Sequence, residues 1–289
     1  MELDIIYNPF AGGERRMKKN LTLVKNKLDN LKVLYRLHRS EYARHAIELT
    51  KKAVASGAKT VVAMGGDGTL NEVLNGLDNF DNITFGLLPC GTGNDFANHC
   101  RLPENVEDAL DVILTKPATY IDFIQMPDLR AINVIGTGLD VRVLQLYSKL
   151  QKKTKIGYFN SLIRALFSYK CTRFTATING EKKTYKSFIS ALANASMFGG
   201  GLKISPDSDV ADGKLNFVYV NEIRGLKLLP ALLKLKKGKI CEIKQAHIEL
   251  CEKIEIESEN CPVMNIDGEL YENRPFKAEI VHNVLKMHR

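Results

Sequence analysis

The chain has 289 residues, 45% of them hydrophobic and 26% charged, which is the composition of an ordinary globular protein and excludes a low-complexity or fibrous one. No apolar run reaches the ~18–20 residues that cross a bilayer, and the opening MELDIIYNPF lacks the features of a secretion signal, so we expect a cytoplasmic protein. The net charge of +8 favours polyanions, among them nucleotides, nucleic acid and anionic membranes, without choosing between them.

The first half of the chain alternates between strand-like and helix-like segments. Strand-like runs occupy residues 3–7, 32–37, 60–64 and 83–88, and helix-like runs occupy residues 14–31, 40–57 and 69–77. We expect Ser40 to cap the second helix and Gly57 to end it. Such alternation predicts βαβ units and a parallel sheet, in which ligands bind beyond the carboxyl ends of the strands.

The second half of the chain is mostly strand-like. Its strand-like runs occupy residues 130–139, 173–180, 183–196, 214–220, 244–258 and 263–271, and helices are expected near 139–151, 157–169 and 225–237. We therefore predict two domains. Residues 1–122, with residues 281–289 as a candidate addition, would form an α/β domain, and residues 123–280 would form a β-rich, antiparallel, sandwich-like domain.

Three glycine-rich segments follow neighbouring predicted strands: YNPFAGG (7–13), GGDGT (65–69) and LLPCGTGNDFA (87–97). Glycines let a ligand approach the backbone closely, and amides at a following helix start favour an anion. Any one of the segments could be a tight turn with no ligand. Three together indicate phosphate binding, although the chain has neither a P-loop nor a GxGxxG fingerprint.

Carboxylates gather in two segments of the second half. PDSDVADGKL (206–215) holds Asp207, Asp209 and Asp212, and NIDGELY (265–271) holds Asp267 and Glu269. Three carboxylates so close together repel one another unless a cation or a turn dipole intervenes. From these residues alone, the first segment could equally be a solvated acidic turn, and the second a β-turn with an exposed glutamate.

The segments NPFAGG, MGGDGTLNEVLNG, LPCGTGNDFA, PDSDVADGKL and IDGE resemble, in order, the motifs of the diacylglycerol kinase catalytic domain family, which is related to sphingosine and ceramide kinases. GGDGT alone is weak, because NAD kinases share it, whereas GGDGTLNEV followed by GTGNDFA is specific. The resemblance implies an NAD-kinase-like or diacylglycerol-kinase-like fold, with ATP bound between the α/β domain and the β-rich domain. Alanine at position 11 departs from the serine that is frequent in the family.

The resemblance also implies the residues that bind ATP and the residues that carry out catalysis. The implied nucleotide-binding residues are Asn8, Pro9, Phe10, Ala11, Gly12, Ser40, Gly65, Gly66, Asp67, Gly68, Thr69, Leu70, Asn71, Glu72 and Thr92. The catalytic residues would be Asp67, Asp267 and Glu269. Either Asp267 or Glu269 would take the proton of the lipid hydroxyl, and the sequence does not decide between them.

Magnesium is the implied metal, because phosphoryl transfer needs an ion that bridges phosphates and Mg²⁺ prefers oxygen ligands. Asp67 and Asp95 stand at the ends of adjacent predicted strands and could face one ion. The resemblance implies a second, structural Mg²⁺ held by Asp209, Asp212 and the backbone carbonyl of Lys214.

Residues 225–239 pair leucines with lysines as a basic amphipathic helix does, and residues 147–170 have a similar basic and aromatic mix. Such helices can lie on an anionic membrane, or they can pack their leucines on a sheet and leave the lysines in water. We expect peripheral membrane contact, because the implied substrate is a lipid.

The sequence thus predicts an ATP- and Mg²⁺-dependent lipid kinase of phospholipid metabolism that converts diacylglycerol to phosphatidic acid. The alternatives are a kinase for phosphatidylglycerol or a sphingoid base, an NAD kinase, and a nucleotide-binding regulator without turnover. We expect no nucleic-acid partner, reduced cysteines, and a homodimer only if an exposed strand edge supports one.

Overall fold

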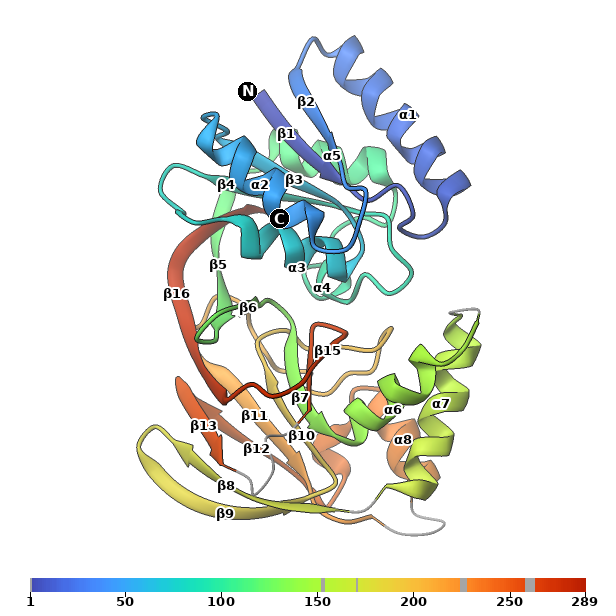
Figure 1. The fold of residues 1–289 in the computed structure, drawn as a ribbon, viewed down its shortest axis with the longest axis vertical. Helices are drawn as coiled ribbons and strands as arrows, with labels where there is room; N and C mark the ends of the chain where they lie inside the picture. Colours follow the sequence, from blue (N-terminus) through green and yellow to red (C-terminus); the bar gives the residue numbers. More distant parts are fainter. Residues whose placement is uncertain (1, 152–153, 170, 224–227, 258–262) are drawn as a thin grey trace. The chain divides into compact units, whose positions relative to one another are not determined.

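The computed structural model describes residues 2–151, 154–169, 171–223, 228–257 and 263–289, which fall into two compact units (Figure 1). Unit 1 comprises residues 1–122 and 282–289, and unit 2 comprises residues 123–281. The strands β5 (Ala118–Gln125) and β16 (Phe276–His288) contribute residues to both units. Residues 225–227 of the third helix predicted in the second half, and Cys261, lie outside the described residues.

Unit 1 is built on a parallel sheet. Its strand order is β2 (Leu34–Arg39), β1 (Glu2–Tyr7), β3 (Thr60–Gly65) and β4 (Thr84–Pro89), and the end of β16 runs parallel to β4. All six residues of β3 are buried, because helices cover both faces of a parallel sheet. The predicted α/β architecture of the first half is therefore confirmed.

The helices of unit 1 form two layers. α1 (Glu14–Asn30) and α5 (Val106–Thr115) share one hydrophobic core with the sheet, and α2 (His45–Ala55) packs against α3 (Asp67–Gly76). A short helix, α4 (Asp95–His99), follows β4.

The predicted start of α2 at Ser40 is wrong, because the helix begins at His45. Its N-cap residue, Arg44, has a left-handed backbone with φ 69° and no capping hydrogen bond from its own side chain. The carboxylate of Glu72 on α3 accepts the amides of Arg44 and Ala46 instead, at 3.0 and 3.1 Å. A side chain distant in sequence thus does what a local serine was expected to do.

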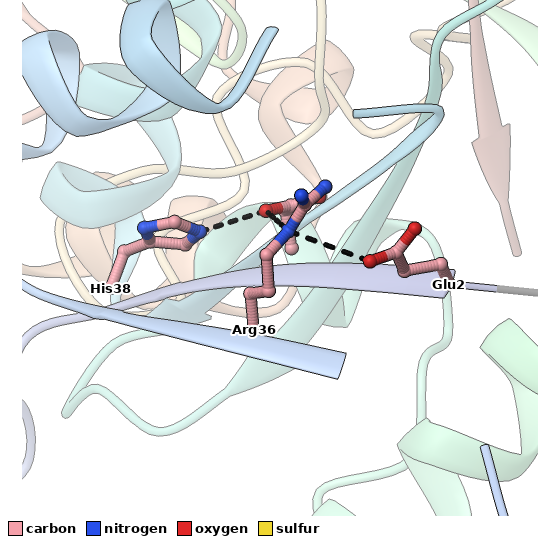
Figure 2. Close-up of polar contacts among 4 residues, drawn as sticks. Glu2, Arg36 and His38 are labelled. Carbon is pink, nitrogen blue, oxygen red and sulfur yellow. Dashed lines mark hydrogen bonds and ion pairs between the residues drawn. The ribbon is translucent and has the colours of Figure 1, made fainter. Parts of the chain in front are cut away.

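A buried carboxylate joins β1 to β2 (Figure 2). Asp4 is only 1% exposed, and its two oxygens accept Nε and Nη2 of Arg36 at 2.9 and 2.8 Å. His38 Nε2 lies 2.8 Å from Asp4 Oδ1, and Glu2 lies 3.6 Å from Arg36 Nε. These contacts compensate the desolvation of Asp4, whose burial would otherwise be costly.

Replacing Arg36 by methionine should lower the free energy of unfolding by about 2–3 kcal/mol, because Asp4 then keeps His38 alone as a side-chain partner among the residues that the structure describes. Urea unfolding would measure the loss. The matched control is Lys182→Met, which breaks the exposed Lys182–Glu257 ion pair and should cost less than about 1 kcal/mol. An equal loss of unfolding free energy in the two variants would contradict the stabilising role of Arg36 beside Asp4.

Unit 2 is an antiparallel sandwich, as predicted. One sheet has the order β12–β11–β10–β7–β14–β15, and the other contains β13, β8, β9 and the start of β16, with β6 pairing to β5. Their bounds are β6 Arg130–Ala131, β7 Val134–Gly138, β8 Thr172–Ile178, β9 Glu181–Ser187, β10 Ile189–Ala193, β11 Leu215–Val220, β12 Ala246–Cys251, β13 Lys253–Glu257, β14 Met264–Ile266 and β15 Glu269–Tyr271. The single run predicted over 244–258 is two strands that lie in different sheets.

The six-stranded sheet separates two cores. Ile135, Leu192 and Phe217 point toward the other sheet, whereas their neighbours in the sequence point toward the helices α6 (Leu139–Ser148), α7 (Lys155–Ser168) and α8 (Leu228–Lys236). This is the period-two alternation of a strand that is covered on both faces. In the described ranges, no helix is long and apolar enough to cross a bilayer.

Candidate active site

The three glycine-rich loops of unit 1 pack against one another. A Cβ atom on Gly12 would lie 2.2 Å from the carbonyl oxygen of Cys90, and one on Gly91 would lie 2.4 Å from Cα of Gly66. The loops after β1, β3 and β4 therefore meet backbone to backbone, at a spacing that only glycine permits. The structure brings together the residues of the three segments for which phosphate binding was predicted.

Asn8 shapes the first of these loops. Its side-chain oxygen accepts the amide of Phe10 at 2.9 Å, and its backbone carbonyl accepts the amide of Ala11 at 3.2 Å. Its own amide donates to Met64 at the end of β3, which ties the first loop to the second. Pro9 and the exposed Phe10 form the outer part of this turn, and Gly12 lies at its contact with Cys90. Alanine at position 11 is therefore compatible with the loop, whose shape rests on Asn8.

Asp67 and Asp95 lie next to each other at the ends of β3 and β4. Asp67 is the first residue of α3, and its carboxylate accepts the amides of Asp95 and Phe96 at 3.1 and 3.2 Å. Asp67 therefore stabilises the N-terminus of α4, while Asp95 itself is 6% exposed. No group of three or more His, Cys, Asp or Glu side chains close enough to hold a metal occurs among the described residues. The acidic pair would thus need phosphate oxygens or waters to complete a magnesium shell.

The other predicted nucleotide-binding residues divide into buried and accessible ones. Thr69 and Leu70 are buried in the first turn of α3, where the Cβ of a residue at position 65 would overlap Thr69, so Gly65 is required there. Ser40 is 7% exposed, and its amide donates to Tyr7. The accessible or partly accessible residues are Gly66, Gly68, Asn71 and Thr92.

Glu72 has a structural task that the sequence did not suggest, since its carboxylate caps α2. We expect Glu72→Ala to lower the free energy of unfolding by about 1–2 kcal/mol and to leave the KM for ATP within about threefold. Thermal melts and ATP kinetics would check this. The control is Glu48→Ala, because Glu48 lies in the first turn of α2 and its carboxylate accepts the hydroxyl of Tyr42 at the surface. A large rise in KM for ATP in Glu72→Ala would instead place this side chain at the nucleotide.

The acidic turn of unit 2 gives its two carboxylates different surroundings. Asp267 has a left-handed backbone with φ 48°, and its carboxylate accepts the amides of Ile132, Asn133 and Val134 at 2.7, 2.9 and 3.0 Å. Glu269, the first residue of β15, is exposed, and within the described part of the chain its carboxylate accepts only the hydroxyl of Tyr271, at 3.2 Å. Asp267 therefore holds the turn, and Glu269 is the more exposed carboxylate of the two.

The acidic cluster at 206–215 forms two turns closed by their own carboxylates. Asp209 Oδ1 accepts the amide of Ala211 at 3.1 Å, and Asp212 Oδ1 accepts the amide of Lys214 at 2.9 Å. Both aspartates are exposed, and each has a second carboxylate oxygen beside these bonds. This all-oxygen donor set, with the Lys214 carbonyl, has the chemistry that Mg²⁺ requires. Asp207 is also exposed.

Besides Asp4, two further buried carboxylates were not singled out from the sequence. Asp122 in β5 is 0% exposed and lies 2.7 Å from His282 Nδ1, and Asp140 in α6 is 3% exposed. Each is a charge placed within an apolar segment, and that contrast is the signal by which the sequence could have revealed it.

An apolar cavity of about 70 Å³ lies in unit 2, where α6, α7 and α8 cover the six-stranded sheet. Its lining includes Leu162 of α7, Leu232 of α8 and Val220 of β11, and Asp140 is the one acidic side chain that contributes to it. A cavity with so apolar a lining suits an apolar ligand.

Comparison with known proteins agrees with this architecture. Residues 2–126 match the model of the diacylglycerol kinase catalytic domain, and residues 133–289 match the YegS C-terminal NAD kinase beta sandwich-like domain. A diacylglycerol kinase of Bacillus subtilis is 29% identical over 273 residues, which is 92% of this chain and 88% of the relative.

Solved structures show the same fold. A diacylglycerol kinase from Bacillus anthracis superposes with a TM-score of 0.81 at 22% identity, covering 99% of this chain and 96% of the other. An NAD kinase from Archaeoglobus fulgidus in complex with ATP gives 0.54 at 14% identity, over 100% and 94% of the two chains. Because the two family models together span nearly the whole chain, this protein belongs to the diacylglycerol kinase family of lipid kinases.

Proposed function

We propose that this kinase transfers the γ-phosphoryl group of ATP to a hydroxyl of a membrane lipid, with diacylglycerol as the acceptor and Mg²⁺ as the metal. The observation that carries the proposal is the meeting of three glycine-rich loops, through Gly12, Cys90, Gly66 and Gly91, at the carboxyl ends of adjacent parallel strands. Loops of this kind present backbone amides to phosphate oxygens.

Phosphoryl transfer needs positioning and charge neutralisation more than covalent help. Asp67 and Asp95 would hold Mg²⁺ or its water shell, and Mg²⁺ would neutralise the charge that develops on the phosphates. Arg15 and Arg16 are exposed in the first turn of α1, directly after the first loop, and could add positive charge there. Asp209, Asp212 and the Lys214 carbonyl would hold a second, structural ion.

Glu269 is the proposed general base. The three backbone amides that surround the carboxylate of Asp267 satisfy it in the ionised form and leave it poorly placed to accept a proton. Glu269 is exposed and can approach a substrate hydroxyl. Asp267 would then act on the reaction by fixing the backbone that carries Glu269.

The apolar cavity under α6, α7 and α8 supports a lipid acceptor, because these helices could part around an acyl chain. Exposed apolar side chains on the same helices support peripheral contact with a membrane. Ile156 and Phe159 of α7 are 75% and 47% exposed, and Leu229 and Leu233 of α8 are 57% and 54% exposed. Lys236 and Lys237, at and just after the end of α8, are exposed as well and suit an anionic bilayer.

The test is transfer of labelled phosphate from ATP, with and without Mg²⁺, to diacylglycerol, phosphatidylglycerol and sphingosine in mixed micelles, and to NAD. Label in phosphatidic acid, lost on chelation of Mg²⁺, is the expected result. Label in another lipid would keep the class and replace the acceptor. Label only in NADP, or binding of ATP with no transfer to any acceptor, would overturn the proposal.

A further inference from the structure

Asn265 connects two buried parts of unit 2. It lies in β14, is 4% exposed, and uses both ends of its side-chain amide. Its Nδ2 donates to Oδ2 of Asp140 at 3.1 Å, and its Oδ1 accepts the amide of Gly268 at 2.9 Å. The side chain thus reaches from α6 to the middle of the acidic turn, one residue before Glu269.

The acidic turn is therefore held from two directions. Asp267 accepts three amides from residues 132–134, and its own amide donates to the carbonyl of Val134 at 3.1 Å. Asn265 holds Gly268, which has φ 96° and no atom within 4 Å of the position a Cβ would take. Gly268 lies between Ile266 and Glu269, which pair in the β14–β15 hairpin, and the bond from its amide to Asn265 adds a side-chain contact within that turn.

The site of Asp140 is shaped to orient Asn265. A Cβ atom on Gly136 would lie 2.0 Å from Oδ2 of Asp140, so only glycine at that position leaves room for the carboxylate. Burial raises the pKa of Asp140 to about 7, while the hydrogen bond from Asn265 and the amides at the start of α6 oppose this rise. The carboxyl group accepts from Nδ2 of Asn265 and thereby fixes which end of the amide faces Gly268.

A bond that only joined α6 to β14 would be served as well by an apolar contact at lower cost, since a buried carboxylate without full compensation destabilises a fold. Oδ1 of Asp140 has no hydrogen-bond partner among the described residues, so the compensation here is incomplete. The amides of Asp140 and Val141 favour its charge without reaching hydrogen-bond geometry. The buried carboxylate of Asp140 therefore costs stability, and its side-chain hydrogen bond among the described residues leads through Asn265 to the acidic turn. Such a costly group is expected where function requires it.

We propose that Asp140 and Asn265 are positioning residues of this kinase, which hold the turn of residues 265–269 so that Glu269 is presented to the acceptor hydroxyl. The inference rests on the proposed role of Glu269. Neither residue is assigned contact with ATP or with the reacting hydroxyl. A displacement of the base by about 1 Å is enough to cost roughly 10²-fold in rate.

The experiment compares Asn265→Ala with Ser190→Ala, a control that removes the buried Ser187–Ser190 hydrogen bond elsewhere in unit 2. Asn265→Ala should lower kcat about 10- to 100-fold and change the KM for ATP less than twofold, whereas Ser190→Ala should keep kcat within about twofold. Asp140→Asn, which still offers an oxygen to Asn265, should retain most of kcat, and Asp140→Leu should lose it as Asn265→Ala does. Equal kcat in Asn265→Ala and Ser190→Ala would overturn the proposal.

Hydrogen exchange gives a second readout that does not depend on turnover. The amide of Gly268 should exchange at least about tenfold faster in Asn265→Ala and in Asp140→Leu, and at the wild-type rate in Ser190→Ala. Unchanged protection of Gly268 in Asn265→Ala would overturn the proposal even if activity fell. A wild-type protein that transfers phosphate to no lipid, yet shows this change in exchange, would refute the proposed function and retain the role of Asn265 in holding the turn.

Discussion

Glu269→Gln should lower kcat about 10²- to 10⁴-fold with diacylglycerol as the acceptor, because glutamine cannot take the proton of the attacking hydroxyl. The melting temperature should stay within about 2 °C of the wild-type value, since the side chain is exposed and its one hydrogen bond to a described residue is the one from the hydroxyl of Tyr271. The KM for ATP should not change, because the substitution removes a group that acts in the transition state rather than one that binds the nucleotide. Steady-state kinetics and a thermal melt of the same preparation would check all three.

The control for this variant is Glu272→Gln, which makes the same chemical change at another exposed glutamate three residues away. Its kcat should equal that of the wild-type protein. If Glu269→Gln kept more than about a tenth of the wild-type kcat, Glu269 could not be the base, and the assignment from its accessibility would be withdrawn.

Asp267→Asn should damage both activity and stability. Asparagine tolerates the left-handed backbone at this position, but its amide nitrogen cannot accept a hydrogen bond, so at least one of the amides of Ile132, Asn133 and Val134 loses its acceptor. Hydrogen bonds to a charged group contribute ~1.5–3 kcal/mol each, and for a unit of this size 1 kcal/mol shifts the melting temperature by ~2–4 °C. We expect the melting temperature to fall by about 5 °C or more and kcat to fall about 10²-fold.

The pair of variants separates the two carboxylates of the acidic turn. Loss of activity without loss of stability identifies the base, whereas loss of both identifies the residue that holds the turn. Asn179→Asp is a useful comparison for Asp267→Asn, since Asn179 also has a left-handed backbone, with φ 48°, and accepts the amides of Glu252 and Lys253 at the surface. It should retain full activity. A stable, inactive Asp267→Asn would reverse the proposed roles.

Much of the fold could be predicted from the sequence because hydrophobic spacing decides which segments are strands and which are helices. The β3 run TVVAM and the α1 stripe of Met17, Val24 and Leu28 carry that signal within a few turns of chain. The start of α2 could not be predicted, because its cap comes from Glu72, far along the chain. The division of residues 246–257 between two sheets was equally hidden, since alternation gives the face of a strand and not its neighbours.

For the site, the sequence identified the loops and the acidic turn but not how they are held. Glycines at positions 12, 66 and 91 indicate that another segment lies close to the backbone there. The sequence does not show which segment that is. The sequence does not distinguish the surroundings of Asp267 from those of Glu269. The carboxylate of Asp267 accepts the amides of residues 132–134, which lie more than 130 residues away in the sequence. Asp140 and Asn265 each read as isolated polar residues until the fold pairs them.

The end of β16 contributes to the stability of the sheet in unit 1. This part of β16 contains Leu285 and Met287, which are both 0% exposed. Lys286 and Met287 pair with Thr84 and Phe85 of β4 in unit 1. Without residues 282–289, β4 would have an open edge and the sheet of unit 1 would lose a strand. A variant that lacks residues 282–289 should therefore lose stability in a sheet whose other strands, β1 to β4, come from residues 2–89, far away in the sequence.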